Sequence, residues 1–184
     1  MILIVIPAKG GSSRLPNKNM AILNGRPMLD YAVLQARMSK RADRIVISTD
    51  DDAIAARAKE LGVETVRRST ALGGDVPLYD VYKHAAEQVG LDGIDILIGL
   101  QADHPDRNVG VDEALAFFEK SGGDMLTTTE ANGTKNGSYK IYNRAMLLSG
   151  VPQNEVTLVD DCTNVHYQED LEKASKILAQ RAGA

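Results

Sequence analysis

Residues 2–19 read ILIVIPAKGGSSRLPNKN, and the rest of the chain is organised around this stretch. The apolar run Ile2–Ile6 predicts a buried strand, and a loop with two adjacent glycines follows it. Such a loop lets the backbone approach a ligand closely, and its N–H groups can face an anion. Lys9, Arg14 and Lys18 add positive charge to the same loop. The loop therefore predicts either a polyphosphate site or a solvated turn with ordinary surface cations.

The spacing of the glycines excludes two familiar nucleotide-binding loops. No Gly-Lys-Ser or Gly-Lys-Thr ends the loop, so it is not a Walker loop. The Gly-x-Gly-x-x-Gly fingerprint of dinucleotide-binding proteins is also absent. A nicotinamide-dependent oxidoreductase is therefore disfavoured.

Composition limits the class of protein further. With 184 residues, 43% of them hydrophobic and 25% charged, we expect one domain that covers residues 1–184. A net charge of −4 disfavours a nucleic-acid partner, which needs a basic face. The apolar run at the N-terminus is too short to span a membrane, so we expect no membrane association. The single cysteine, Cys162, excludes an internal disulfide and fits a cytoplasmic location.

The order of the predicted elements indicates an α/β protein. Strands that alternate with helices predict βαβ units, a mainly parallel sheet and a three-layer α/β/α arrangement. Ligands of such sheets bind beyond the carboxyl ends of the strands, so the opening loop and the segment after Leu100 are expected to face one ligand. Further strands are predicted at 44–48, 63–66, 94–100, 124–129 and 136–142, and helices at 27–38, 49–61, 76–89, 111–118, 144–148 and from about 169 onward.

The opening loop resembles the signature I-P-A-R-x-x-S-x-x-L-P-x-K-N of the CMP-sugar-acid synthetases, the cytidylyltransferases that activate sialic acids and Kdo. Lys9 stands where that family usually has arginine, Arg14 is more like the Kdo enzymes, and Lys18 with Asn19 is more like the sialate enzymes. The resemblance implies a Rossmann-like nucleotidyltransferase fold and transfer of CMP from CTP to a sugar acid. It implies nucleotide binding by Pro7, Ala8, Lys9, Gly10, Gly11, Ser12, Ser13, Arg14, Lys18 and Asn19.

A second match follows the strand predicted at 94–100. The sialate enzymes have L-Q-P-T-S-P there and the Kdo enzymes Q-G-D-E-P, and this chain keeps Gln101 of both and Asp103 of the Kdo type. Because Mg²⁺ takes oxygen ligands and often only one or two carboxylates, Asp103 is expected to bind it; the alternative is an aspartate that caps the next turn. Gln101 carries both a donor and an acceptor, which suits a pyrimidine edge. His104 is a candidate general base.

Residues 162–171, CTNVHYQEDL, resemble the family's closing motif I-D-I-D-T-x-x-D-L. Asn164 and His166 stand where the family has two aspartates, one or both of which bind metal. An asparagine carbonyl can bind Mg²⁺, whereas neutral histidine suits Mn²⁺ or Zn²⁺ better. Three interpretations stay open: Asn164 makes the second metal contact, His166 acts as a base, or the metal depends on Asp103 and phosphate oxygens. A fourth is that both residues merely lead into the last helix. We expect Mg²⁺, with Mn²⁺ as the alternative.

Two charged clusters resemble the family less directly. The run Ser48–Asp52 is interpreted as a helix start, because acidic residues there cap N–H groups and offset the helix dipole. Arg67 and Arg68, followed by the glycines and aspartate of 73–75, resemble the family's R-R-P-x-x-L-x-x-D. Arg68 is therefore a candidate nucleotide contact, and the alternative is a solvated arginine pair.

The last expectations concern the acceptor and the assembly. Asn136 and Tyr139 are expected to border the acceptor. Residues 130–161 are shorter than the region in which the sialate synthetases insert a dimerisation arm, which leaves open whether this chain forms a homodimer.

Together these motifs predict a cytidylyltransferase that binds CTP and a small acidic acceptor. Lys9, Arg14, Lys18 and Asp103 form the expected catalytic set, in which the three cations hold the triphosphate. Asp103, with Asn164 or His166, would hold the metal. One alternative is a nucleotidyltransferase of the same fold that uses another nucleoside triphosphate, or a sugar phosphate or phosphonate as acceptor. Another is a catalytically silent nucleotide-binding protein.

Overall fold

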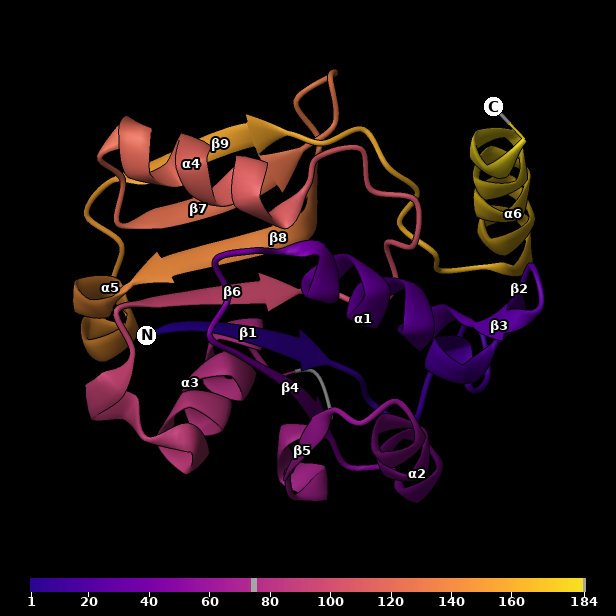
Figure 1. Cartoon of the computed structure of the whole chain (residues 1–184), viewed down its shortest axis with the longest axis horizontal. Coiled ribbons are helices and arrows are strands. Elements are labelled where there is room, and N and C mark those ends of the chain that lie inside the picture. The colour runs from indigo at the N-terminus through magenta and orange to yellow at the C-terminus, as the bar shows by residue number, and fades with distance from the viewer. Residues whose placement is uncertain (74–75, 184) are drawn as a thin grey trace.

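The strand β1 (Ile2–Pro7) lies inside a seven-stranded sheet of the computed structural model, which describes residues 1–73 and 76–183. β1 pairs in parallel with β4 (Arg44–Thr49) and with β6 (Ile96–Leu100). Its central residues are buried, as expected for a parallel strand that is covered on both faces. The order across the sheet is β5-β4-β1-β6-β8-β7-β9 (Figure 1). The remaining strands are β5 (Glu64–Arg67), β7 (Met125–Thr129), β8 (Lys135–Asn143) and β9 (Glu155–Val159).

Helices cover both faces of this sheet, so the predicted three-layer α/β/α fold is confirmed. One face carries α1 (Met28–Met38), α2 (Asp52–Glu60) and α4 (Val111–Ser121), whose apolar side chains join those of β1 in one buried cluster. The other face carries α3 (Leu78–Val89) and α5 (Arg144–Ser149). Short 3-10 turns occupy Lys18–Met20, Thr70–Leu72 and Leu91–Gly93.

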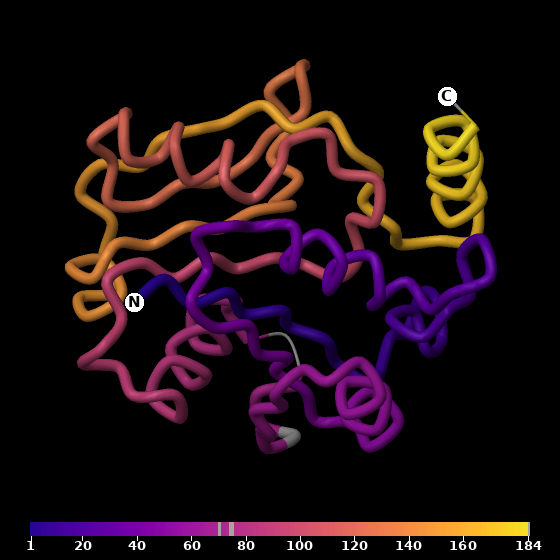
Figure 2. Tube along the Cα trace, in the orientation of Figure 1, coloured from indigo at the N-terminus to yellow at the C-terminus, as the bar shows by residue number. Residues whose placement is uncertain are grey.

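The last helix, α6 (Gln168–Ala182), lies at the end of the molecule where the opening loop emerges. It packs against the small hairpin formed by β2 (Ile22–Leu23) and β3 (Arg26–Pro27), and Figure 2 shows these two distant parts of the chain side by side. Leu171 and Ala174 bury their side chains in this contact. The carboxyl-terminal helix therefore closes the same end of the sheet from which the first loop emerges.

The sheet differs from the prediction in its second half. β8 runs antiparallel between β6 and β7, and β9, which was not predicted, pairs in parallel with β7. β9 is a short edge strand whose residues alternate between exposed and half-buried. Its single weakly apolar face explains why the pattern between 130 and 161 gave no clear signal.

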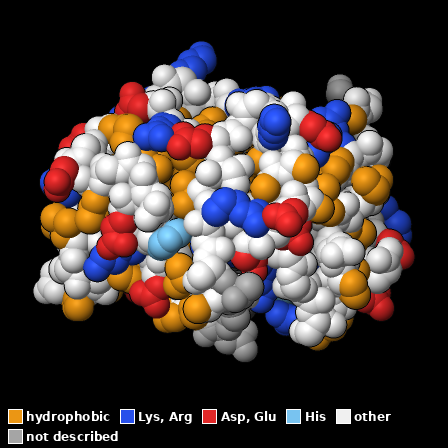
Figure 3. Space-filling view, turned by 90° about the horizontal axis from the view of Figure 1, so that it is seen from below, with side chains coloured by type: hydrophobic (Ala, Val, Ile, Leu, Met, Phe, Trp, Pro, Cys, Tyr) orange, Lys and Arg blue, Asp and Glu red, His pale blue; other side chains and the backbone are white. Residues whose placement is uncertain are grey.

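Local signals set the helix boundaries. Pro77 is the N-cap of α3, and Asp51 caps α2 by accepting a hydrogen bond from the N–H of Ile54. Gly62 follows α2 with a φ of 64°, a left-handed conformation that glycine adopts without strain. Within the described ranges, no helix combines the length and the apolar character needed to cross a membrane. On the face seen in Figure 3, acidic and basic side chains are interspersed.

Candidate active site

A cavity of about 390 Å³ opens at the carboxyl ends of β1 and β6, and we call it the rim cavity. It brings together two segments that the sequence placed on one rim, the loop after β1 and the segment after β6. Ala8 is buried beneath the loop, and Asn19 holds the loop's path by donating a side-chain hydrogen bond to the carbonyl of Lys9 (2.9 Å). Among the predicted residues, Pro7, Lys9, Arg14, Lys18, Asn19, Arg68, Gln101 and Asp103 line this cavity.

An ion pair joins the two segments. Lys18 Nζ donates to Asp103 Oδ2 at 2.7 Å and to the carbonyl oxygen of Val165 at 3.0 Å. The N–H of Val165 in turn donates to the backbone carbonyl of Asp103. The side chains of Lys18 and Asp103 are only 13% and 15% exposed. The expected proximity of the basic loop and this carboxylate is therefore present.

Asp103 is held as a carboxylate by its neighbours. Burial alone would raise its pKa, but the hydrogen bonds and charges of His104 and Lys18 lower the pKa well below its usual range. His104 is fully buried, and its Nδ1 lies 2.9 Å from Asp103 Oδ1. A side chain so enclosed cannot reach an acceptor, so the suggestion that His104 is a general base is wrong. Its contact orients Asp103.

Asn164 and His166 flank Val165 and therefore lie beside this ion pair. Within residues 1–73 and 76–183, the buried atoms Asn164 Oδ1 and His166 Nδ1 have no hydrogen-bond partner. Burial, together with the charges of Lys18 and Arg14, lowers the pKa of His166, which favours a neutral imidazole at pH 7. Both residues line a second hollow of about 360 Å³, which we call the polar cavity.

Asp103 and Asn164 carry oxygen donors of the kind that Mg²⁺ takes, although Asp103 lines the rim cavity and Asn164 the polar cavity. Among the described residues, no group of three or more His, Cys, Asp or Glu side chains could form a protein cage for a metal. Mg²⁺ commonly takes only one or two protein ligands and completes its shell with phosphate oxygens and water. Asp103 would supply one carboxylate, and the amide oxygen of Asn164, which has no hydrogen-bond partner in the described part of the chain, would be a second ligand of the preferred type.

Arg68 and Gln101 complete the wall of the rim cavity. The Arg68 side chain is only 3% exposed, and burial lowers its pKa. The side-chain amide of Gln101 donates to the carbonyl of Gly137 on β8. Gly73 lines the cavity beside them, whereas the predicted motif residues Gly74 and Asp75 lie outside the described residues.

The two residues expected at the acceptor have different positions. Tyr139 is fully buried on the α4 side of the sheet, and its hydroxyl donates to the carbonyl of Val109 at 2.7 Å. The expectation that Tyr139 borders the acceptor is wrong, because the alternation of β8 turns its ring into the core. Asn136 lines the polar cavity, and its side-chain amide donates to the carbonyl of Asp160 at 2.7 Å.

A buried polar network that the sequence did not reveal supports the segment after β6. Arg107 is 4% exposed and donates to the carbonyls of Gln101, His104 and Ser138. Asp160 is 1% exposed and accepts from the backbone N–H of Val109 and the hydroxyl of Ser138. Asp160 directly follows β9. A charged residue at the end of a strand could have identified it from the sequence, but β9 itself was not predicted.

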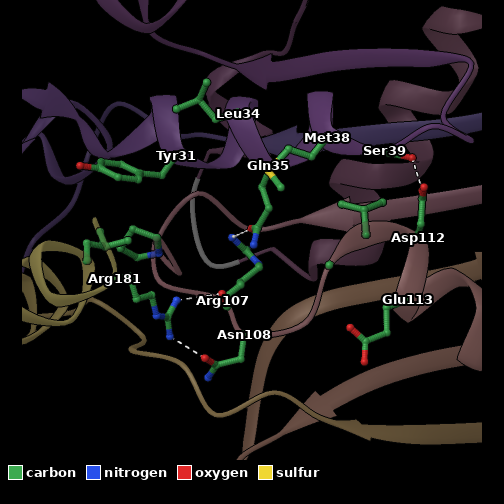
Figure 4. Close-up of a pocket in the computed structure, with 14 residues that line it drawn as sticks. Tyr31, Leu34, Gln35, Met38, Ser39, Arg107, Asn108, Asp112, Glu113 and Arg181 are labelled. Carbon is green, nitrogen blue, oxygen red and sulfur yellow. Dashed lines mark hydrogen bonds between the residues drawn. The ribbon is translucent and has the colours of Figure 1, made fainter. Parts of the chain in front are cut away.

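The carboxyl-terminal helix holds this segment from the other side. Figure 4 shows Arg181 of α6 reaching Asn108, and the same guanidinium donates to the carbonyls of Asp106 and Arg107. These contacts lie beside a cavity of about 430 Å³ between α1, α4 and α6. The segment that carries Asp103 is therefore anchored by its own strand, by β8 and by α6.

The mainly parallel sheet, with a basic loop after β1 and a carboxylate after β6, defines the class of this protein, an α/β protein with the nucleotidyltransferase fold. Residues 3–108 match the model of a family described as cytidylyltransferase. The chain therefore belongs to the cytidylyltransferase family.

Curated relatives carry related names. The 8-amino-3,8-dideoxy-manno-octulosonate cytidylyltransferase of Shewanella baltica is 32% identical over 147 residues, which are 79% of this chain and 56% of that protein. The protein of the same name from Shewanella frigidimarina is 31% identical over 129 residues, which are 70% of this chain and 51% of that protein. The chain thus spans about half the length of the curated relatives that it matches.

Solved structures share the fold over nearly the whole chain. The structure of CMP:2-keto-3-deoxy-manno-octonic acid synthetase complexed with CTP has a TM-score of 0.79 at 17% identity, and the match covers 98% of this chain and 99% of that one. A cytidylyltransferase from Leptospira borgpetersenii has a TM-score of 0.74 at 21% identity, covering 97% of this chain and 87% of that one. At these identities the likeness concerns the fold alone.

Proposed function

We propose that this protein transfers CMP from CTP to a small sugar acid, with release of pyrophosphate. The observation that carries the proposal is the Lys18–Asp103 ion pair at 2.7 Å, which unites a loop suited to phosphates with a carboxylate suited to a metal. Membership of the cytidylyltransferase family supports CTP as the nucleotide.

In the proposed reaction a hydroxyl oxygen of the acceptor attacks the α-phosphorus of CTP. The bond from that phosphorus to the oxygen bridging the α- and β-phosphates breaks, pyrophosphate leaves, and the hydroxyl proton passes to solvent. Lys9, Arg14 and Lys18 hold the triphosphate and stabilise the charge on the leaving group, as positioned cations do in phosphoryl transfer. Asp103 and Asn164 would hold a Mg²⁺ ion, which when bound neutralises charge on the phosphate oxygens.

The polar cavity is the proposed place of the acceptor. Asn164 and His166 line it, and Val165 between them contacts both members of the ion pair. Its wall carries both signs of charge, because Glu130 and Asp170 line it beside Lys135 and Lys173, and Lys135 is paired with Glu155 at 2.8 Å. Lys173 is therefore the candidate partner for a carboxylate, and Asn136 would supply an amide for a sugar hydroxyl. The names of the curated relatives and the Kdo-type Asp103 favour a Kdo-like acid over a sialic acid.

The proposal is tested by measuring pyrophosphate release from the purified protein with CTP, Mg²⁺ and a panel of sugar acids that includes Kdo and sialic acids. We expect turnover with a Kdo-like acid, and a loss of about 10²-fold or more in kcat for Asp103→Asn. Tight CTP binding without turnover on any acceptor would instead favour a silent nucleotide-binding protein. Faster turnover with another nucleoside triphosphate would favour the alternative nucleotidyltransferase.

A further inference from the structure

Three consecutive aspartates follow β4, and the structure gives them three different environments. Asp51 caps α2 through the N–H of Ile54 at 2.9 Å. Asp52 has a fully exposed side chain and pairs with Arg67 on the surface. Asp50 is different, because its side chain is only 16% exposed and lies next to Arg68, which lines the rim cavity. The interpretation of this run as a helix start holds for Asp51 and leaves Asp50 unexplained.

One oxygen of Asp50 contacts both the basic loop and Arg68. Asp50 Oδ1 accepts a hydrogen bond from the backbone N–H of Gly10, in the basic loop, at 3.2 Å. The same oxygen lies 3.7 Å from a terminal nitrogen of the Arg68 guanidinium. Gly10 lies in the loop after β1 and Arg68 in the segment after β5, so Asp50 connects these two elements through one oxygen.

The loop is seated closely on the turn that carries Asp50. The N–H of Ala8 donates to the carbonyl of Ser48 at 2.9 Å. A Cβ added to Gly10 would lie 2.4 Å from Asp51 Oδ2, closer than any side chain tolerates. The backbone of the loop is therefore in close contact with the turn after β4 at Gly10, where a side chain would not fit.

Arg68 is a buried cation whose charge partner is Asp50. Its side chain is 3% exposed, and within the described part of the chain its buried Nε has no hydrogen-bond partner. In that same part, Asp50 is the one carboxylate found within 4.0 Å of this guanidinium. A cation buried to this degree needs a partner charge to keep its place, and it lines the rim cavity, where a nucleotide would bind.

We propose that Asp50 is a positioning residue of the nucleotide site, which uses one carboxylate oxygen to hold the basic loop and Arg68 in register with each other. This inference rests on the proposed function, since it takes the rim cavity as the place where CTP binds. The inference predicts the opposite effect on CTP affinity from the one that charge alone would produce. A negative charge beside phosphates repels them, so neutralising Asp50 should tighten binding if charge alone mattered, whereas loss of positioning weakens it.

Calorimetric binding of CTP and CMP to Asp50→Asn tests the inference, with Asp52→Asn as the matched control that removes the same charge two residues away. We expect Asp50→Asn to raise the Kd for CTP about tenfold and to raise the Kd for CMP by less, because the loop faces the phosphates. Asp52→Asn should change either Kd by less than about twofold. If part of the variant protein were unfolded, the binding stoichiometry would fall equally for CTP and CMP, and their Kd values would not change by different factors.

Unchanged or tighter CTP binding by Asp50→Asn would overturn the inference, as would an equal loss for CTP and CMP. If Asp50→Asn does not fold, the double variant Asp50→Asn/Arg68→Met removes both charges and is compared with Arg68→Met alone. Weaker CTP binding by the double variant supports the inference, and equal binding overturns it. Wild-type protein that bound neither nucleotide would overturn the proposed function itself, and the inference with it.

Discussion

Replacing Lys18 with methionine removes the cation that joins the first loop to the segment after β6. The variant keeps the length and apolar stem of the side chain but loses two contacts. These are the ion pair with Asp103 Oδ2 at 2.7 Å and the hydrogen bond to the carbonyl of Val165 at 3.0 Å. Asp103 then keeps His104 as its remaining side-chain partner among the described residues.

The structure sets the size of the effect. Exposed ion pairs contribute about 0–1 kcal/mol, while breaking a buried pair costs about 3–5 kcal/mol because a buried charge is left unpaired. The two side chains are 13% and 15% exposed, so the pair lies nearer the buried limit. We expect Lys18→Met to lower the free energy of unfolding at pH 7 by about 3 kcal/mol.

The effect should depend on pH with a definite sign. Burial opposes ionisation of Asp103, but His104 and Lys18 together hold its pKa in the folded protein well below the usual value, which is about 3.9 in an unfolded chain. The unfolded state therefore binds more protons as the pH falls, and the stabilisation is present above about pH 4 and lost below it. The difference in the free energy of unfolding between wild type and Lys18→Met should therefore become smaller below about pH 4.

Urea unfolding followed by circular dichroism, between about pH 7 and pH 3 with a chelator present, measures this difference. Lys9→Met is the matched control, because Lys9 is exposed on the same loop and its replacement should cost less than about 0.5 kcal/mol. The reasoning would be refuted if Lys18→Met lowered the free energy of unfolding by less than about 1 kcal/mol at pH 7. It would also be refuted if the difference in this free energy between the two proteins stayed constant down to about pH 3.

Three further predictions concern residues outside the proposed chemistry. Tyr139→Phe removes the hydroxyl that donates to Val109 and should cost about 1 kcal/mol in urea unfolding; a large change in the KM of the acceptor would contradict the burial of this ring. Gly99→Ala places a Cβ 2.3 Å from Cζ of Tyr82 and should cost about 2 kcal/mol or more in the same assay, and a neutral result would show that the ring moves freely. Burial raises the pKa of the Cys162 thiol, so its reaction with an aromatic disulfide at pH 7 should be at least about tenfold slower in the native protein than in urea; equal rates would contradict this.

Prediction from sequence succeeded where the signal was local or followed from strand direction. The helix predicted at 27–38 is α1, and Leu29, Ala32, Val33 and Ala36, which follow the spacing of one helical face, are buried in it. Lys18 and Asp103, 85 residues apart, meet because the carboxyl ends of parallel strands share one edge of the sheet. The expectation for Tyr139 failed, because the sequence did not show which face of β8 its side chain takes.

The sequence by itself determined the α/β class, the helices, the basic loop and the carboxylate opposite it, since apolar periodicity and glycine spacing are properties of neighbouring residues. Only the tertiary structure decided that β8 enters the sheet antiparallel, that His104 is enclosed behind Asp103, and that Asp50 faces the loop and Arg68 while Asp52 faces water. Those outcomes depend on which strands pair and which face each side chain takes. They are relations between residues far apart in the chain, and they arise only when the sheet is assembled.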